Sequence, residues 1–478
     1  MLPARPATPE KSRALTVLAA WLVVLSAVAW LCAPLFQDLR KWGGHDWDMV
    51  TSFRYLTVQS LREYGQLPGW NPYACGGYTA WGYVESDTNL VSPWLPLYLL
   101  LDLRLALRLE VVGSMLVSAA GVWVLAGRFT RSAAARALAC VVFVINARAT
   151  MQAATGHAMH LYYAWAPWAL AFFDRSVSGL APRSGAPSTA RSLARAAGAA
   201  LVPRLRPRDS VLAGAFIALM VYTGAIYPLP QTLVLLASYA LVLSLVARRA
   251  LPLVSFGVTA AVAFGLSAPK LFPIADAISR HPRVVESREA MGPGLLVELL
   301  TSRAPVPVPQ WGWHEWGIYV GWASLAILVL GALLSRGPRE TALKWTGILL
   351  VVLGMGAFHP RAPWTLLHEL PVFRSQHVPS RWLYPALLIF AVLAARAAGE
   401  LLERGLRRSP VAEILALAAV ACIAIDAGTI ARGPFERAFW MELAEGAHRP
   451  NRRVSPGEEH PRHLHYVKPD WAPPRSPG

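Results

Sequence analysis

Long apolar segments dominate the hydrophobic pattern of this chain. Residues 15–31 and residues 211–246 contain no charged side chain. Runs of 18 or more apolar residues can cross the roughly 30 Å hydrocarbon core as helices, whose backbone polar groups bond internally. The pattern therefore predicts an all-α polytopic membrane protein with about 11 transmembrane helices, within a range of 10 to 13. The predicted spans are 14–35, 106–126, 133–150, 158–173, 210–226, 229–247, 252–272, 316–335, 342–358, 382–402 and 410–430.

Two apolar segments are open to more than one interpretation. The first apolar run follows three basic residues, as in a signal peptide, but residues 14–35 exceed the roughly 7–15 residues of a signal core. We expect a retained first transmembrane helix. Residues 90–103 are apolar but short, and they contain Pro93 and Pro96. An additional span, a re-entrant piece and an interfacial helix all remain open for this segment.

The distribution of charge predicts the orientation. Only 15% of the 478 residues are charged, and the formal net charge is +17. With the N-terminus (1–13) in the cytoplasm, the inner segments hold 21 Lys and Arg in 79 residues and the outer loops hold 13 in 149. This excess obeys the positive-inside rule, so the basic charge does not indicate a nucleic-acid partner. The Arg-rich loop 174–209 is then cytoplasmic, and the tail 431–478 is extracytoplasmic.

The multi-span domain (14–430) has three large outer loops, at 36–105, 273–315 and 359–381. We expect the first loop to be partly helical, with turns at its Gly and Pro residues. It contains Asp46 and Asp48, about ten residues after the first span. A carboxylate there suits a general base toward a hydroxyl, or a ligand for a divalent cation such as Mg or Mn. The alternative is a pair of solvated acids at a helix start.

Further polar and aromatic residues of the first loop are candidates for substrate contact. Its tryptophans are also typical of the interfacial aromatic belt. Cys75 is the one loop cysteine, and the other three lie in apolar segments, so no disulfide framework is expected. The substrate candidates are His45, Glu63, Trp70, Asn71, Glu85 and Asp87.

Basic residues in the other two outer loops run against the charge rule. Guanidinium groups bind phosphate in a bidentate manner, so these residues are candidates for a phosphate group. Headgroup anchoring and salt bridges to loop acids are the alternatives. The candidates are Arg280, Arg283, Arg374, His377 and Arg381. His157 and His160, near the outer mouth of the fourth span, are interpreted as interface residues, and Glu315 opens the eighth span.

Two strings resemble a known family. Residues 60–78 read SLREYGQLPGWNPYACGGY and follow His45-Asp46, while residues 375–383 read SQHVPSRWL. Together they resemble the YfhO-like bacterial membrane proteins, a family that is similar to the GT-C superfamily of glycosyltransferases. The resemblance implies a GT-C-like fold in a bacterial inner membrane. It also implies a polyprenyl-phosphate-linked sugar as donor and an active site on the outer face.

The resemblance further implies roles for individual residues. Asp46 would be the catalytic base, with Asp48 as assistant or substitute, and Arg374 and Arg381 would contact the lipid phosphate. The acceptor would be a glycan, a lipid or a protein outside the cytoplasm. A carrier or flippase for a lipid-linked saccharide and a non-catalytic envelope-assembly protein are the alternatives. A carrier is expected to place ionisable residues in mid-membrane, whereas the acids and arginines here concentrate in outer loops.

Overall fold

The computed structural model describes residues 9–71, 77–84, 89–177, 206–405 and 410–442. Glu85, Asp87 and most of the predicted loop 174–209 and tail 431–478 lie outside these residues. The α-helices are α1 (Pro9–Cys32), α2 (Trp47–Arg62), α3 (Leu95–Leu100), α4 (Leu103–Ala126), α5 (Ala133–Val144), α6 (Ala147–Ala154), α7 (Ala166–Ser176), α9 (Pro207–Tyr222), α10 (Pro228–Ala247), α11 (Leu251–Arg280), α12 (Pro293–Thr301), α13 (Trp313–Trp316), α14 (Trp322–Leu334), α15 (Pro338–Gly354), α16 (Pro363–His368), α17 (Leu383–Glu400) and α18 (Pro410–Glu436).

Shorter elements connect these helices. The described residues include two small antiparallel sheets, one formed by β1 with β4 and the other by β2 with β3. The strands are β1 (Trp42–Gly43), β2 (Trp70–Asn71), β3 (Tyr78–Thr79) and β4 (Phe439–Met441). The short turns are η1 (Ala33–Phe36), η2 (Ala158–Trp165), η4 (Phe373–Ser375), η5 (Pro379–Trp382) and the π-helical η6 (Leu401–Gly405).

The apolar pattern located the helices of the structure. Each of the eleven predicted spans contains a helix. Among the described residues, however, seven helices are long and apolar enough to cross a membrane. They are 14–36, 103–126, 133–154, 228–247, 251–280, 379–403 and 411–436. The other predicted spans fall on α7, α9, α14 and α15, which have 11, 16, 13 and 17 residues.

The segment 90–103 does not form an additional span. It contains α3, a helix of six residues that packs against α2 and α4. At 1.5 Å per residue this helix is about 9 Å long, far short of the hydrocarbon core.

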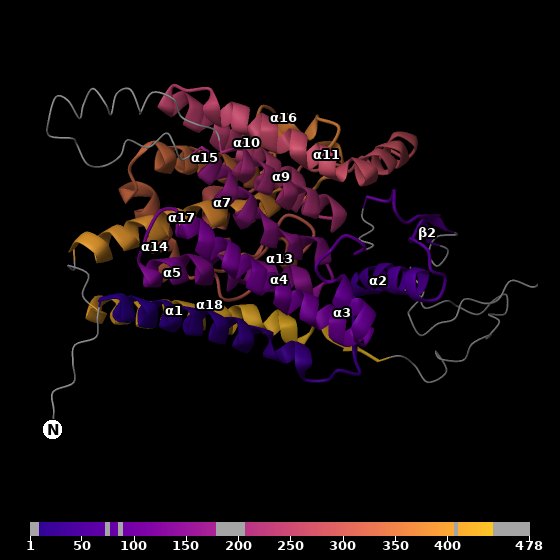
Figure 1. The fold of residues 1–478 in the computed structure, drawn as a ribbon, viewed down its shortest axis with the longest axis horizontal. Coiled ribbons are helices and arrows are strands. Elements are labelled where there is room, and N and C mark those ends of the chain that lie inside the picture. Colours follow the sequence, from indigo (N-terminus) through magenta and orange to yellow (C-terminus); the bar gives the residue numbers. More distant parts are fainter. Residues whose placement is uncertain (1–8, 72–76, 85–88, 178–205, 406–409, 443–478) are drawn as a thin grey trace, which may run out of the picture.

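The helices lie side by side in a bundle, and the first loop covers one end of it. Figure 1 shows α2, α3 and β2 beyond the end at which α1 finishes. α18 packs along α1 and ends at the same place, because β4, which follows it, pairs with β1. The expected partly helical first loop is therefore observed, with α2 as its main helix.

A buried ion pair holds α2 in place. Arg54 of α2 and Glu110 of α4 are 1% and 2% exposed, and their side chains are 3.2 Å apart. The hydroxyls of Tyr98 and Tyr162 also donate to this carboxylate. Burying two charges is tolerated only with such additional hydrogen bonds, so these contacts dictate where α2 sits.

Candidate functional site

The candidate site begins where α2 meets the turn after α6. Asp46 is the N-cap residue of α2, and its backbone N–H donates to the carbonyl of Thr155 at 3.1 Å. The indole of the buried Trp47 donates to the carbonyl of Ala153 at 2.9 Å. Gly156 has a φ of +83°, and a Cβ there would lie 2.6 Å from the carbonyl carbon of Asp46. A glycine is therefore needed for the turn to approach this closely.

This approach brings His157 beside Asp46. The Nε2 atom of His157 lies 3.2 Å from Oδ2 of Asp46. Its Nδ1 atom lies 2.7 Å from Oε1 of Gln152 and 3.5 Å from Oε1 of Glu315. The side chains of Asp46, His157 and Glu315 are 51%, 15% and 4% exposed. The arrangement therefore connects a half-exposed carboxylate to a buried one through an imidazole.

Glu315 lies between two buried arginines. Nε of Arg381 donates to its Oε2 at 3.0 Å, and Nη2 of Arg381 donates to its Oε1. Nη2 of Arg148 is 3.7 Å from Oε2, and the Glu315 carbonyl accepts from both Arg148 and Ser380. Burial alone would raise the pKa of Glu315, but Arg381, His157 and Arg148 together lower it below its ordinary value. The carboxylate is therefore ionised.

The buried group retains unneutralised positive charge. Two guanidinium groups face the single carboxylate of Glu315. Nη1 of Arg381 and both Nε and Nη2 of Arg148 are buried without a hydrogen-bond acceptor among the described residues. Arg381 also stacks over the ring of Tyr227, 3.9 Å from its centroid. Buried donors of this kind are costly, and the oxygens of a phosphate are suitable acceptors for them.

His377 lies at the edge of the same group. Its Nδ1 is 3.2 Å from the Tyr227 hydroxyl, and its ring centroid is 4.6 Å from that of Trp311. Burial and the charge of Arg381 lower the pKa of His377 to about 3. His377 is therefore neutral at ordinary pH and is able to hydrogen-bond a ligand without adding charge.

The structure brings together some of the predicted phosphate candidates and separates others. Arg381 and His377 lie around Tyr227. Arg280 pairs with Asp276 at 2.9 Å, and Arg374 pairs with Glu369 at 3.2 Å, all with exposed side chains. Arg283 is exposed, and its charge contributes to lowering the pKa of His377.

The first-loop candidates are spread over the loop. Asp48 lies in the first turn of α2 and is partly buried. His45 is exposed, with a φ of +54°. Glu63 caps the end of α2 and accepts from Gln59 at 3.2 Å. Trp70 is exposed, whereas Asn71 is buried and donates to the Tyr78 hydroxyl at 3.0 Å. Within the described part of the loop, Asp46 is the candidate carboxylate that contacts the His157 and Glu315 group.

Sequence reasoning missed several members of this group. Arg148 lies inside the predicted span 133–150, and an ionisable residue within an apolar span is itself a signal of function. Gln152 and Glu315 gave no comparable signal, because their importance comes from partners far away in the chain. His157 was interpreted as an interface residue, but it contacts two carboxylates.

The described residues do not offer a ready-made metal centre. No group of three or more His, Cys, Asp or Glu among them is arranged to hold a metal ion. Asp46 contacts a single histidine, and Glu315 is surrounded by cations. Mg²⁺ often keeps several waters and is held by one or two carboxylates together with substrate phosphates, so the predicted Mg or Mn stays a prediction.

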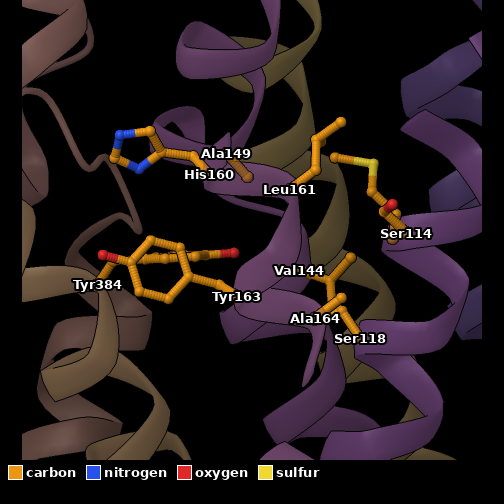
Figure 2. A pocket seen from close by; sticks show the side chains of 10 residues that line it. Ser114, Ser118, Val144, Ala149, His160, Leu161, Tyr163, Ala164 and Tyr384 are labelled. Carbon is orange, nitrogen blue, oxygen red and sulfur yellow. The ribbon is translucent and has the colours of Figure 1, made fainter. Parts of the chain in front are cut away.

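A small cavity lies behind the site. Figure 2 shows His160 and Tyr163 of η2 with Tyr384 of α17 on one side and Ser114 and Ser118 of α4 on the other. Its volume is about 30 Å³, enough for a water molecule. Two polar atoms of its lining, Nε2 of His160 and Oγ of Ser114, are buried without a hydrogen-bond partner among the described residues.

No family model and no curated protein matches the chain. Among solved structures, it is similar to the arabinofuranosyltransferase AftD from Mycobacteria, with 14% identity and a TM-score of 0.49. That match covers 89% of this chain but 27% of AftD, so the chain spans about a quarter of its length. It is also similar to ArnT from Cupriavidus metallidurans bound to undecaprenyl phosphate, with 15% identity, a TM-score of 0.45 and coverage of 90% and 78%. With both TM-scores below 0.5, neither likeness extends those activities to this chain.

Proposed function

We propose that this chain is a membrane glycosyltransferase of the GT-C type, which transfers a sugar from a polyprenyl-phosphate donor to an extracytoplasmic acceptor. One observation carries the proposal. The half-exposed carboxylate of Asp46 is joined through His157 and Glu315 to buried arginines that carry more charge than Glu315 neutralises. A base and a phosphate-binding group are thus connected in one network.

The two halves of this network match the two needs of glycosyl transfer. Asp46 accepts the proton of the acceptor hydroxyl as its oxygen attacks the anomeric carbon. The bond from that carbon to the phosphate oxygen breaks, and the phosphate leaves with the bonding electrons. Donors that meet the developing charge lower the barrier, and Nη1 of Arg381 is such a donor. A single displacement inverts the anomeric configuration.

The site lies where the apolar helices meet the first loop, and this position suits a lipid-linked donor. Arg148 and Arg381 belong to helical segments that are apolar enough to span a membrane, whereas Asp46 belongs to the loop at the end of the bundle. A phosphate in the headgroup layer can meet these arginines while the polyprenyl chain stays in the bilayer. The acceptor then approaches Asp46 from the aqueous side.

Sugar transfer in proteoliposomes tests the proposal. The purified protein is supplied with a mixture of polyprenyl-phosphate sugars and a mixed panel of glycan, lipid and peptide acceptors. We expect Asp46→Asn to reduce transfer by about 10²–10⁴-fold, the usual contribution of a general base. Asp38→Asn is the matched control, because this carboxylate lies in the same loop and accepts hydrogen bonds from Arg40.

The outcomes separate the proposal from its alternatives. Equal transfer by wild type and Asp46→Asn overturns the role of Asp46, and a parallel Asp48→Asn variant then tests the other acid. Movement of the lipid-linked sugar between leaflets without any transfer supports a carrier instead. Absence of both activities supports a non-catalytic envelope protein.

A further inference from the structure

The hydrogen bonds of Gln152 dictate which nitrogen of His157 carries a proton. The amide nitrogen of Gln152 donates to the carbonyl of His314 at 2.7 Å and to Oε2 of Glu315 at 3.0 Å. Both partners are acceptors only, so the amide cannot be reversed without placing oxygen against oxygen. Oε1 of Gln152 must therefore face Nδ1 of His157, at 2.7 Å, and Nδ1 carries a hydrogen.

The other nitrogen of His157 then requires a second proton. A neutral imidazole has one N–H and one lone pair. With the hydrogen on Nδ1, the lone pair on Nε2 would lie 3.2 Å from the carboxylate oxygen of Asp46. A lone pair and a carboxylate oxygen at that distance repel each other, which favours a second proton on the pair. A carboxylic acid is a stronger acid than an imidazolium, which assigns this proton to the imidazole.

The surrounding charges agree with a cationic His157. Asp46 faces it from the start of α2, and Glu315 faces it from α13. Glu315 neutralises one of the two charges of Arg148 and Arg381, and Asp46 supplies the second carboxylate of the group. Burial lowers the pKa of His314, which keeps that neighbour neutral. The remaining titratable neighbours are His160, at 6.1 Å between ring centroids, and His377, whose pKa burial lowers.

We propose that His157 is a protonated positioning residue that clamps Asp46, an inference that rests on the proposed glycosyl transfer for its catalytic meaning. The imidazolium pairs through Nε2 with Oδ2 of Asp46 at 3.2 Å and donates from Nδ1 to Gln152, with the Glu315 carboxylate 3.5 Å from Nδ1. Oδ2 is thereby occupied. Oδ1 accepts the proton of the acceptor hydroxyl, and Oδ2 of the resulting acid still accepts from Nε2.

The clamp also predicts how activity ends at high pH. Loss of the Nε2 proton leaves the lone pair against Oδ2, so the Asp46 side chain turns toward solvent and the base is misplaced. A shift of about 1 Å in a catalytic group can cost roughly 10²-fold in rate. Transfer by the wild type is therefore expected to fall on the alkaline side, in a single-proton step.

The protonation state is measured directly by nitrogen-15 NMR of the full-length protein in lipid nanodiscs, with labelled histidine. Subtracting the spectrum of His157→Gln identifies the His157 signals, and His281→Gln serves as the control for an exposed histidine. We expect two protonated nitrogens in the wild type at neutral pH. In Asp46→Asn the new amide donates to Nε2, so His157 becomes neutral with one bare nitrogen. A bare Nε2 in the wild type overturns the proposal.

Kinetics then distinguishes the clamp from a merely structural histidine. His157→Gln keeps a donor toward Asp46 at every pH, so it should retain transfer within about tenfold of wild type and lose the alkaline decline, whereas His157→Leu should lose roughly 10²-fold throughout. An unchanged alkaline decline in His157→Gln contradicts the clamp. An imidazolium seen by NMR in a protein that transfers no sugar retains the clamp and refutes the glycosyltransferase. Sugar transfer by a protein whose His157 is neutral retains the glycosyltransferase and refutes the clamp.

Discussion

Arg381 and Glu315 form a bidentate ion pair inside the protein, although 66 residues separate them in the chain. Both side chains are 4% exposed. The pair connects η5, the turn before α17, to α13 and orients the carboxylate toward His157. The pair contributes mainly by positioning the neighbouring groups. Its net contribution to stability is small, because the desolvation cost of two buried charges offsets much of their electrostatic attraction.

Removing this carboxylate leaves two buried guanidinium groups without a counter-ion. Glu315→Gln is therefore expected to lower the free energy of unfolding by about 3–5 kcal/mol, the usual cost of breaking a buried pair. Unfolding of the purified protein in mixed detergent micelles measures the change. Glu369→Gln is the matched control, because its partner Arg374 is exposed and such pairs contribute about 0–1 kcal/mol. Equal shifts in the two variants would contradict the importance of burial.

The turn at Gly156 offers a test of the geometry around Asp46. In Gly156→Ala a non-glycine residue has to adopt a φ of +83°, and its Cβ collides with the backbone of Asp46 and Trp47. We expect a loss of about 1–2 kcal/mol from the backbone conformation alone, with more from the collision. Circular dichroism during thermal unfolding measures the total.

A second glycine, Gly65, separates the cost of the backbone conformation from the cost of the steric collision. Gly65 has a φ of +60°, but a Cβ there meets nothing within 4 Å. Gly65→Ala therefore reports the conformational cost by itself, and Gly156→Ala should exceed it. If Gly156→Ala also reduces sugar transfer and Gly65→Ala does not, the approach of His157 to Asp46 matters for function. Indistinguishable variants would show that the turn tolerates a side chain.

The apolar pattern predicted the helices because burial in lipid or in the bundle requires long uncharged segments. Among the described residues, seven of the eleven predicted spans fall on helices long enough to cross a membrane and four fall on shorter helices, so the predicted count stays a prediction. In the described part of the first loop, the expected turns are seen at Gly65 and Gly77, both of which have a positive φ.

The candidate site was harder to predict than the fold. Asp46, Arg381 and His377 were identified as candidates, and the structure places them in one neighbourhood. Glu315 and Gln152 were not, since a hydrogen-bond network between residues 46, 152, 157, 315 and 381 depends on tertiary packing. The spacing of these residues along the chain does not predict such contacts.

The buried ion pair between Arg54 and Glu110 is expected to hold α2, and with it the first loop, against the bundle. Arg54→Met leaves Glu110 buried as an uncompensated anion, so α2 should loosen and the stability should fall by about 3–5 kcal/mol. The double variant Arg54→Met with Glu110→Leu removes both charges and should recover part of that loss. Limited proteolysis of residues 47–62 measures the exposure of α2. Faster cleavage in the double variant than in Arg54→Met would contradict this account.

Acid stability should depend on His377. Its pKa is about 3 in the folded protein, below the ordinary value of about 6.5 that applies when the chain is unfolded. Between these values the unfolded chain binds a proton that the folded one does not, so stability is complete above pH 6.5 and falls as the pH drops toward 3. His314, whose pKa burial also lowers, acts in the same direction.

His377→Gln removes one of these two protons and should flatten the loss of thermal stability between about pH 6.5 and 5.5 without abolishing it. The lower limit of about pH 5.5 stays more than one unit above the ordinary Glu pKa of about 4.3. His281→Gln, a change at an exposed histidine, should leave the slope as in wild type. Unfolding temperatures across this range in one detergent measure the three slopes. A His377→Gln slope equal to that of wild type would mean that the imidazole is as free to protonate in the folded protein as in the unfolded chain.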